Sequence, residues 1–302
     1  MVYVVIPVHN RMRVTEKCLG SLEEQTFGGF KIIVVDDGST DGTEEMIREG
    51  FPKVILLKGD GNLWWTGATN LGVEYVLERS QDKDYVITLN DDTIVFPDFI
   101  ECLVRSAKDL PKSLIGSVSV SDQDASTVYE ADMRVNWMTA KYRNRCKGKD
   151  YSAILERSSL IQPTDVLSGR GTLIPVEAFR EIGLYDRRLP HHGADYEFSR
   201  RANRKGYHLF VDYRAVVVAN VHFTGLGYGP KPVKWGDLIK SFFSIRSRNH
   251  LGYRFIFARL CCNWWEFPFF YAFDIFRLFI LSVVTSSAAS GRMVSKGDQT
   301  LG

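Results

Sequence analysis

The sequence has few cysteines, and they follow no recognisable pattern. Its 302 residues contain five of them. An odd number cannot complete a disulfide framework, and none has the C-x-x-C spacing of a zinc site. This absence excludes a small disulfide-stapled fold and favours a reducing compartment. The five are Cys18, Cys102, Cys146, Cys261 and Cys262.

A strong net charge is also absent. The 38 basic and 36 acidic residues give a formal charge of +2, so no whole-molecule field favours nucleic acid as a partner. No internal repeat or low-complexity tract is present. With 45% hydrophobic residues, the chain can bury one large core or two modest ones, as an ordinary globular enzyme does.

Long uninterrupted apolar runs are missing as well. The apolar run after Met1 lacks the basic region and the length of a secretory signal, so it predicts a buried strand. The apolar stretch from Trp264 to Val284 is interrupted by Glu266, Asp274 and Arg277, and it favours lying on a membrane over crossing one. We therefore expect a cytoplasmic protein, or one at the cytoplasmic face of a membrane.

The first half of the chain alternates short apolar runs with helix-like stretches. This rhythm is typical of βαβ units, which build a mostly parallel sheet that binds ligands at the carboxyl ends of its strands. Polar segments follow three of the runs, at Pro7–Asn10, Asp36–Ser39 and Asn90–Thr93, and we expect them to converge. The predicted strands are Val2–Val5, Ile32–Val35, Val54–Leu57 and Tyr85–Leu89.

The second half is less regular. Residues 115–165 predict only strands and loops without definite bounds. Around this stretch the pattern predicts helices at Pro97–Leu110, Val176–Ile182 and Ala194–Lys205, and strands at Val166–Ile174, His208–Val211 and Ala215–Val218.

Two acidic pairs could carry chemistry. Asp91 and Asp92 end a predicted strand, where paired carboxylates suit a hard divalent cation whose shell is completed by substrate phosphates. Asp36 and Asp37 offer acceptors to a nucleoside. The alternative for both pairs is a solvated turn or a helix cap.

Taken in order, PVHN, VVDDGSTDGT and LNDDT resemble the motifs of the inverting family 2 glycosyltransferases. The resemblance implies a GT-A fold, an α/β class with a Rossmann-like, mostly parallel central sheet flanked by helices and, here, a helical C-terminal extension. It also implies a UDP-, dTDP- or GDP-sugar donor and a divalent metal, Mn²⁺ or Mg²⁺.

By this resemblance, the first part of the chain holds the donor. His9 stands where the family tends to have a stacking Tyr or Phe, and Thr69 where arginine is common. Asp92 is the expected metal ligand. His222 is a second candidate, with the alternative that it has no such role. The resemblance assigns donor nucleotide binding to Pro7, His9, Asn10, Asp36, Asp37, Gly67, Asn70, Asn90 and Asp91.

The segment HHGADYEFSRRANRKGY is similar to the family's acceptor-side pattern and places Asp195 at the position of the catalytic base, after Ala194 where the family often has Glu. Such a carboxylate removes the proton of the attacking hydroxyl. Four residues are candidates for contacts with the acceptor or the diphosphate: Trp65, Arg170, His192 and Glu197. Their alternatives are, in the same order, an ordinary core residue, a simple turn, a surface loop and a surface ion network.

The carboxyl-terminal region is basic and aromatic. Between Lys231 and Arg259, seven basic residues face only Asp237, which suits anionic headgroups; packed helices at a homodimer interface are the alternative. We expect a GT-A domain at 1–228, with a donor half at 1–96 and an acceptor half at 97–228, then a helical extension at 229–285 and a flexible tail at 286–302.

The sequence therefore predicts an inverting glycosyltransferase that moves a sugar from a nucleoside-diphosphate sugar to a hydroxyl of a glycan or lipid-linked acceptor. Its acceptor-helix pattern is nearest to rhamnosyltransferase-like enzymes of bacterial polysaccharide assembly. Two alternatives stay open: a catalytically silent nucleotide-sugar-binding or membrane-scaffold protein, and a sugar nucleotidyltransferase. The latter should carry a glycine-rich basic phosphate loop after its first strand, which HNRMRV lacks.

Overall fold

The computed structural model describes residues 1–302 apart from 125, 157–158, 220–238, 245–246, 248 and 281–302. The chain divides into two compact units. The first comprises Met1–Val135 and Tyr142–Leu226, and the second comprises Asn136–Lys141 and Gly227–Gly302. The predicted boundary at residue 228 and the donor and acceptor halves remain predictions. The predicted tail at 286–302 lies outside the described residues.

The first unit is built on a mixed sheet with the strand order β10-β12-β6-β11-β4-β1-β2-β3. On this path β12, β6, β4, β1, β2 and β3 run in one direction, and β10 and β11 run against them. The strands of this sheet are β1 Val2–Val8, β2 Phe30–Asp36, β3 Ile55–Lys58, β4 Tyr85–Thr88, β5 Thr93–Val95, β6 Ser113–Ser121, β7 Val128–Glu130, β10 Ile161–Pro163, β11 Thr172–Pro175 and β12 His208–Ala219. Two further strands, β8 Met133–Asn136 and β9 Lys141–Asn144, form a separate two-stranded sheet.

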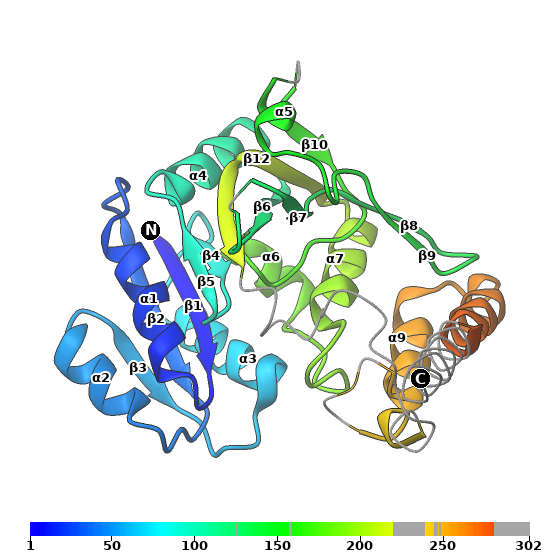
Figure 1. Cartoon of the computed structure of the whole chain (residues 1–302), viewed down its shortest axis with the longest axis horizontal. Coiled ribbons are helices and arrows are strands. Elements are labelled where there is room, and N and C mark those ends of the chain that lie inside the picture. The colour runs from blue at the N-terminus through cyan, green and yellow to red at the C-terminus, as the bar shows by residue number, and fades with distance from the viewer. Residues whose placement is uncertain (125, 157–158, 220–238, 245–246, 248, 281–302) are drawn as a thin grey trace, which may run out of the picture. The chain divides into compact units, whose positions relative to one another are not determined.

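Helices cover both faces of this sheet (Figure 1). Alternate residues of β1 point to opposite faces: Val4 and Ile6 join the core that also contains residues of α1, α2 and α4, whereas Val5 faces α3. A Cβ on Gly72 of α3 would lie 2.4 Å from Val5 Cγ1, so glycine is what lets α3 pack this closely. The helices are α1 Met12–Glu23, α2 Thr43–Gly50, α3 Trp64–Leu77, α4 Phe99–Asp109, α5 Ser152–Leu155, α6 Val176–Ile182 and α7 Ala194–Arg204. The predicted α/β fold with a mostly parallel sheet and flanking helices is confirmed.

One prediction about strands was wrong in detail. The strands expected at His208–Val211 and Ala215–Val218 form one strand, β12, whose pairing with β6 shifts register between Asp212 and Val216. The extra residues are held by Asp212, which is fully buried and accepts from the Arg214 backbone (2.9 Å). Residues 115–165, where strands and loops without definite bounds were expected, include most of β6, a strand that is paired on both sides within the sheet.

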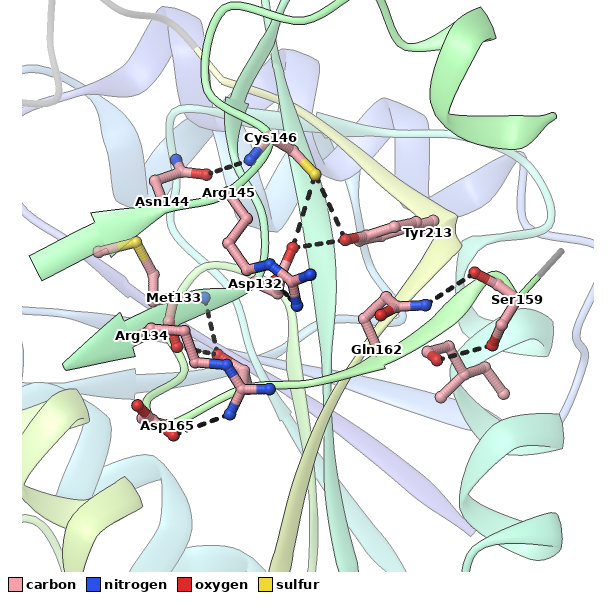
Figure 2. Close-up of polar contacts among 12 residues, drawn as sticks. Asp132, Met133, Arg134, Asn144, Arg145, Cys146, Ser159, Gln162, Asp165 and Tyr213 are labelled. Atoms are coloured by element: carbon pink, nitrogen blue, oxygen red, sulfur yellow. Dashed lines mark hydrogen bonds and ion pairs between the residues drawn. The ribbon is translucent and has the colours of Figure 1, made fainter. Parts of the chain in front are cut away.

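A buried polar network fixes the segment around β8 and β9 to the sheet (Figure 2). Asp132 is fully buried; its carboxylate accepts from the Tyr213 hydroxyl on β12 and from Cys146 Sγ (3.5 Å) and pairs with Arg145 (3.4 Å). Nearby, Asp165 accepts from Arg134 (3.0 Å). Since a buried carboxylate must be paired, this network explains how a loop-rich segment keeps a defined structure.

The second unit is helical. It contains α9 (Leu251–Cys261) and a further helical stretch over residues 266–280, drawn in orange and red in Figure 1. Trp137 stacks on Phe257 and Phe270 with ring centroids 6.4 and 5.8 Å apart, so the turn between β8 and β9 belongs to this unit's core. No helix in the described part of the chain is long and apolar enough to span a bilayer.

Candidate active site

The carboxyl ends of the parallel strands bring the predicted motifs together. Where β1 and β2 end, the Asp37 amide donates to the Val8 carbonyl (2.8 Å). Because β11 is antiparallel to β4, its start lies at the same edge, and the Gly171 amide donates to the Thr88 carbonyl (2.8 Å). The segment 168–171 therefore meets the Asn90–Asp92 motif, although about eighty residues separate them in the sequence.

Loops β1–α1 and β2–α2 are held together by His9 and Asn10. His9 Nδ1 donates to the carbonyl of Asp37 (2.6 Å), and the Asn10 side-chain oxygen accepts from the Thr40 amide (2.7 Å). Asn10 has a φ of 52°, a left-handed conformation that asparagine tolerates better than most residues. Both side chains are exposed at the edge of the sheet, whereas Pro7 lies within the buried strand β1.

Asp36 and Asp37 are both buried but are engaged to different degrees. Asp37 accepts from three backbone amides of the β3–α3 loop: Gly61 on Oδ1 (2.8 Å), and Leu63 (2.9 Å) and Trp64 (3.0 Å) on Oδ2. Asp36 Oδ1 accepts from one amide, that of Ser39 (2.9 Å). Asp37 thus organises the loop, and Asp36 is the better placed of the two for a nucleoside contact.

Asp91 and Asp92 both pair with the side chain of Arg11, a residue that the sequence analysis did not single out. Arg11 Nη1 lies 3.2 Å from Asp91 Oδ1 and 3.0 Å from Asp92 Oδ2. Burial raises the pKa of Asp91 to about 7, against the opposing effect of Arg11. Asp92 Oδ1 is buried and has no hydrogen-bond partner among the described residues. A buried carboxylate oxygen without a partner is costly, and this one suits a cation brought by a ligand.

Helix α3 links this motif to the second half of the unit. Trp65 Nε1 donates to the Asn90 side-chain oxygen (3.0 Å). The other candidates on α3 are buried: Asn70 donates to and accepts from the backbone of Tyr185 (2.9 and 3.0 Å), and Gly67 abuts Leu63. Asn70 therefore ties α3 to the loop before α7, and its role in donor binding remains a prediction.

Asp195 lies in the first turn of α7, after Gly193, whose φ is 85°. Its Oδ2 accepts from the Gly169 amide (3.0 Å) and its Oδ1 from the Tyr196 amide (2.9 Å). Burial raises the pKa of Asp195, although these two amides favour the charged form. A Cβ on Gly169 would lie 2.1 Å from Trp65 Cζ2. One indole therefore bridges Asn90 and the backbone that orients Asp195.

A second acidic residue near Asp195, Glu130, was missed because it lies in the stretch that the sequence left without definite bounds. Glu130 Oε1 accepts from the Tyr196 hydroxyl (3.1 Å), and Oε2 lies 3.4 Å from Arg170 Nη1. Arg170 is buried and also packs 5.7 Å from the Tyr129 ring centroid. Tyr196, next to Asp195 in the recognised motif, is the signal that could have led to this corner.

The remaining candidates are Glu197, His192 and His222. Both oxygens of Glu197 accept from Arg201 (2.7 and 2.8 Å), and Arg201 also donates to the carbonyls of Ile182 and Leu184. This pair braces the loop before α7. His192 is half-buried, with its ring 4.3 Å from that of His191. His222 lies outside the described residues.

Comparison with known proteins agrees with this architecture. Residues 3–182 match the family model "Glycosyl transferase family 2". The chain belongs to this family. As a family 2 glycosyltransferase, it is an enzyme that transfers sugar from a nucleotide sugar to an acceptor. The predicted family and enzyme class are confirmed.

Relatives of this family 2 enzyme include the "N-acetylglucosaminyl-diphospho-decaprenol L-rhamnosyltransferase" of Mycobacterium tuberculosis. That protein is 28% identical over 235 residues, which cover 70% of this chain and 73% of the relative. The uncharacterized glycosyltransferase YibD of Escherichia coli is 28% identical over 191 residues, covering 62% of this chain and 45% of YibD.

Solved structures share the fold. The mannosyltransferase PcManGT from Pyrobaculum calidifontis, in complex with GDP-Man and Mn²⁺, has a TM-score of 0.58 at 15% identity, covering 98% of this chain and 79% of that one. GalNAc-T7 with UDP, GalNAc and Mn²⁺ also has a TM-score of 0.58, at 17% identity, covering 73% of this chain and 43% of that one.

Proposed function

We propose that this family 2 enzyme is an inverting glycosyltransferase in which Asp195 is the general base and Asp92 faces the donor diphosphate. The observation that carries the proposal is the short link from Asn90 through Trp65 to Gly169, whose amide donates to Asp195. It joins the Asn90–Asp92 motif and a carboxylate of α7 at one edge of the sheet.

The donor half of the proposal rests on exposed and incompletely paired polar groups. Asp36, His9 and Asn10 surround the ends of β1 and β2, where a nucleoside would lie. Asp91 and Asp92 would hold Mn²⁺ or Mg²⁺ with Asp92 Oδ1, the oxygen that has no hydrogen-bond partner in the described part of the chain. In this proposal two carboxylates and the donor phosphates would hold the cation, as is common for Mg²⁺. The metal would supply positive charge to the leaving diphosphate.

The transfer itself would use Asp195. Its carboxylate takes the proton of the acceptor hydroxyl as that oxygen attacks the anomeric carbon. The bond from this carbon to the diphosphate oxygen breaks on the opposite face, so the configuration inverts. The amides of Gly169 and Tyr196 fix the carboxylate, and Arg11, beside Asp91 and Asp92, lends positive charge to the edge where the diphosphate leaves.

A hydroxyl of a glycan or of a lipid-linked sugar is the proposed acceptor. The name of the mycobacterial relative describes a polyprenyl-diphosphate-linked acceptor and a rhamnosyl transfer. At 28% identity we carry over the acceptor class and leave the sugar open. Glu130, Tyr196 and Arg170 form the polar corner beside Asp195 in which such an acceptor would be oriented.

Calorimetric titration with UDP-, dTDP- and GDP-sugars, with and without Mn²⁺, tests the donor site. We expect one nucleotide class to bind, more tightly with metal. The variant Asp195→Asn should keep this binding and lose transfer. If folded protein binds no sugar nucleotide, the donor site is wrong; if Asp195→Asn retains transfer, the assignment of the base is wrong.

A further inference from the structure

The helical stretch 266–280 of the second unit exposes an apolar face. Nine positions between 264 and 280 are exposed, and every one is Trp, Phe, Pro, Ala or Ile. Trp264 is 80% exposed and Phe276 62% exposed. Exposed residues at 265, 269, 273, 276 and 280 recur with the spacing of one helix face. A stripe of this kind is unusual on a surface that meets only water.

The charged residues of the same stretch point the other way. Glu266 caps the start of the helix by accepting from the Asn263 amide (2.7 Å). Asp274 pairs with Arg254 of α9 (2.7 Å), and Arg277 donates to the carbonyls of Thr139 (2.8 Å) and Ala140. The three charges that interrupt the apolar run in the sequence are therefore used within the unit, and the outer face is left without charge.

The surrounding sequence is strongly basic. Residues 227–302 contain ten Lys and Arg and four Asp and Glu, a net charge of +6 against +2 for the whole chain, which leaves −4 for residues 1–226. Among the described residues, Lys240 and Arg259 are exposed. Two copies joined through this region would bring like charges together. Anionic lipid headgroups would instead be attracted to it.

We propose that the exposed face of residues 264–280 docks on a bilayer that contains anionic lipids, with the helix lying in the plane of the interface. Its fifteen helical residues measure about 22 Å at the ~1.5 Å rise of an α-helix, so the helix would rest in the headgroup region. Trp264 and Trp265 stand at its start, and indole rings favour this interface. The inference concerns a surface outside the candidate active site and does not depend on the proposed reaction.

Flotation of the full chain with vesicles tests the proposal. We expect binding to vesicles of phosphatidylglycerol and phosphatidylcholine, with weaker binding to phosphatidylcholine alone and at high salt. The double variant Phe269→Ser/Phe276→Ser should weaken binding by roughly tenfold or more, because two large exposed apolar side chains are lost. The matched control Ile94→Ser/Leu155→Ser removes exposed apolar residues of the first unit and should bind like the unchanged chain.

A second measurement covers the case in which the serine variant fails to fold. Lipids with brominated acyl chains should quench tryptophan fluorescence of the unchanged chain, and Trp264→Tyr/Trp265→Tyr should lose most of this quenching. Absence of vesicle binding by the folded, unchanged chain would overturn the proposal. So would a dimer of the unchanged chain that Phe269→Ser/Phe276→Ser dissociates, since a second copy would then occupy the face.

Discussion

The contact between Gly169 and Trp65 makes a quantitative prediction. In Gly169→Ala the new Cβ would lie 2.1 Å from Cζ2 and 2.6 Å from Cη2 of Trp65. The indole cannot move freely, because its Nε1 bonds Asn90 and its ring packs edge-on against Tyr185 at 5.3 Å. Overpacking of this kind costs about 1–3 kcal/mol. For a unit of this size that corresponds to a fall of about 2–12 °C in the thermal midpoint.

The same substitution should affect catalysis more than donor binding. The Gly169 amide donates to Asp195 Oδ2, so any displacement of this backbone moves the proposed base. A shift of about 1 Å can cost on the order of a hundredfold in rate. We therefore expect kcat to fall by about ten- to a hundredfold while the affinity for the nucleotide sugar, measured by calorimetry, changes little.

A double-mutant cycle isolates the clash. Trp65→Phe removes the far edge of the indole, where Cζ2 and Cη2 lie, together with the hydrogen bond to Asn90. Alone it should cost about 1–3 kcal/mol. Combined with Gly169→Ala, the total should fall short of the sum by about 1–2 kcal/mol, as for residues in direct contact. The control Gly20→Ala, where a Cβ meets nothing within 4 Å, should be neutral or stabilising. Additive effects, or a fully active and stable Gly169→Ala, would refute the reasoning.

Three further perturbations follow from the same geometry. Because burial raises the pKa of Asp195, the acid limb of the pH–rate profile should lie above pH ~4, the usual range of aspartate. The folded state then binds this proton more tightly than the unfolded state does, so ionisation of Asp195 lowers stability as the pH rises. The thermal midpoint of Asp195→Asn, measured against that of the unchanged chain, should therefore be relatively higher at neutral pH than at acid pH. Asp37→Asn sets an NH₂ group against at least one loop amide, such as that of Gly61, and should lower the free energy of urea unfolding by about 1–3 kcal/mol; an unchanged urea midpoint would contradict this. Gly72→Ala, whose Cβ would meet Val5, should cost a similar ~1–3 kcal/mol, visible as a lower thermal midpoint.

The meeting of the polar segments at one edge of the sheet could be predicted from the sequence, because it depends only on which strands are parallel. β1 is a continuous apolar run that the structure buries throughout, and parallel strands end on the same side. The polar residues after β1, β2 and β4 therefore had to converge. The partners of Asp37 could not be predicted in this way, since its three amides come from residues 24–27 positions further along.

The second half of the sheet was harder to predict for two physical reasons. In β6, serines alternate with valines between Ser117 and Ser121, although nearly the whole strand is buried. Small hydroxyl-bearing side chains fit the interior but look like a surface pattern. In β12, the register shift at Asp212–Val216 interrupts the alternation, so one strand resembles two. In both strands, buried polar residues such as Ser119 and Asp212 resemble surface positions in the sequence.

Hydropathy along the chain likewise averages over the two faces of a helix. Glu266, Asp274 and Arg277 lower the apolar character of the stretch that follows Trp264, yet each is bonded within its own unit. The surface offered to the surroundings is thus more apolar than the sequence average. The prediction that this region lies on a membrane remains a prediction, and the structure supplies the particular face on which it can be tested.

The antiparallel strand β11 explains how one edge can serve both halves of a transfer reaction. A parallel strand beside β4 would place the residues before it at the opposite edge, away from Asp91 and Asp92. Since β11 runs against β4, the chain arrives at the carboxyl edge with Gly169–Gly171 and only then enters the sheet. A Cβ on Gly171 would lie 2.5 Å from Ser117 Oγ, and one on Gly169 would strike Trp65, so both glycines are required for this approach. The close fit that gives Asp195 its orientation therefore also limits how far Asn90 and Asp195 can move apart, and substitutions that loosen it should impair transfer before they impair donor binding.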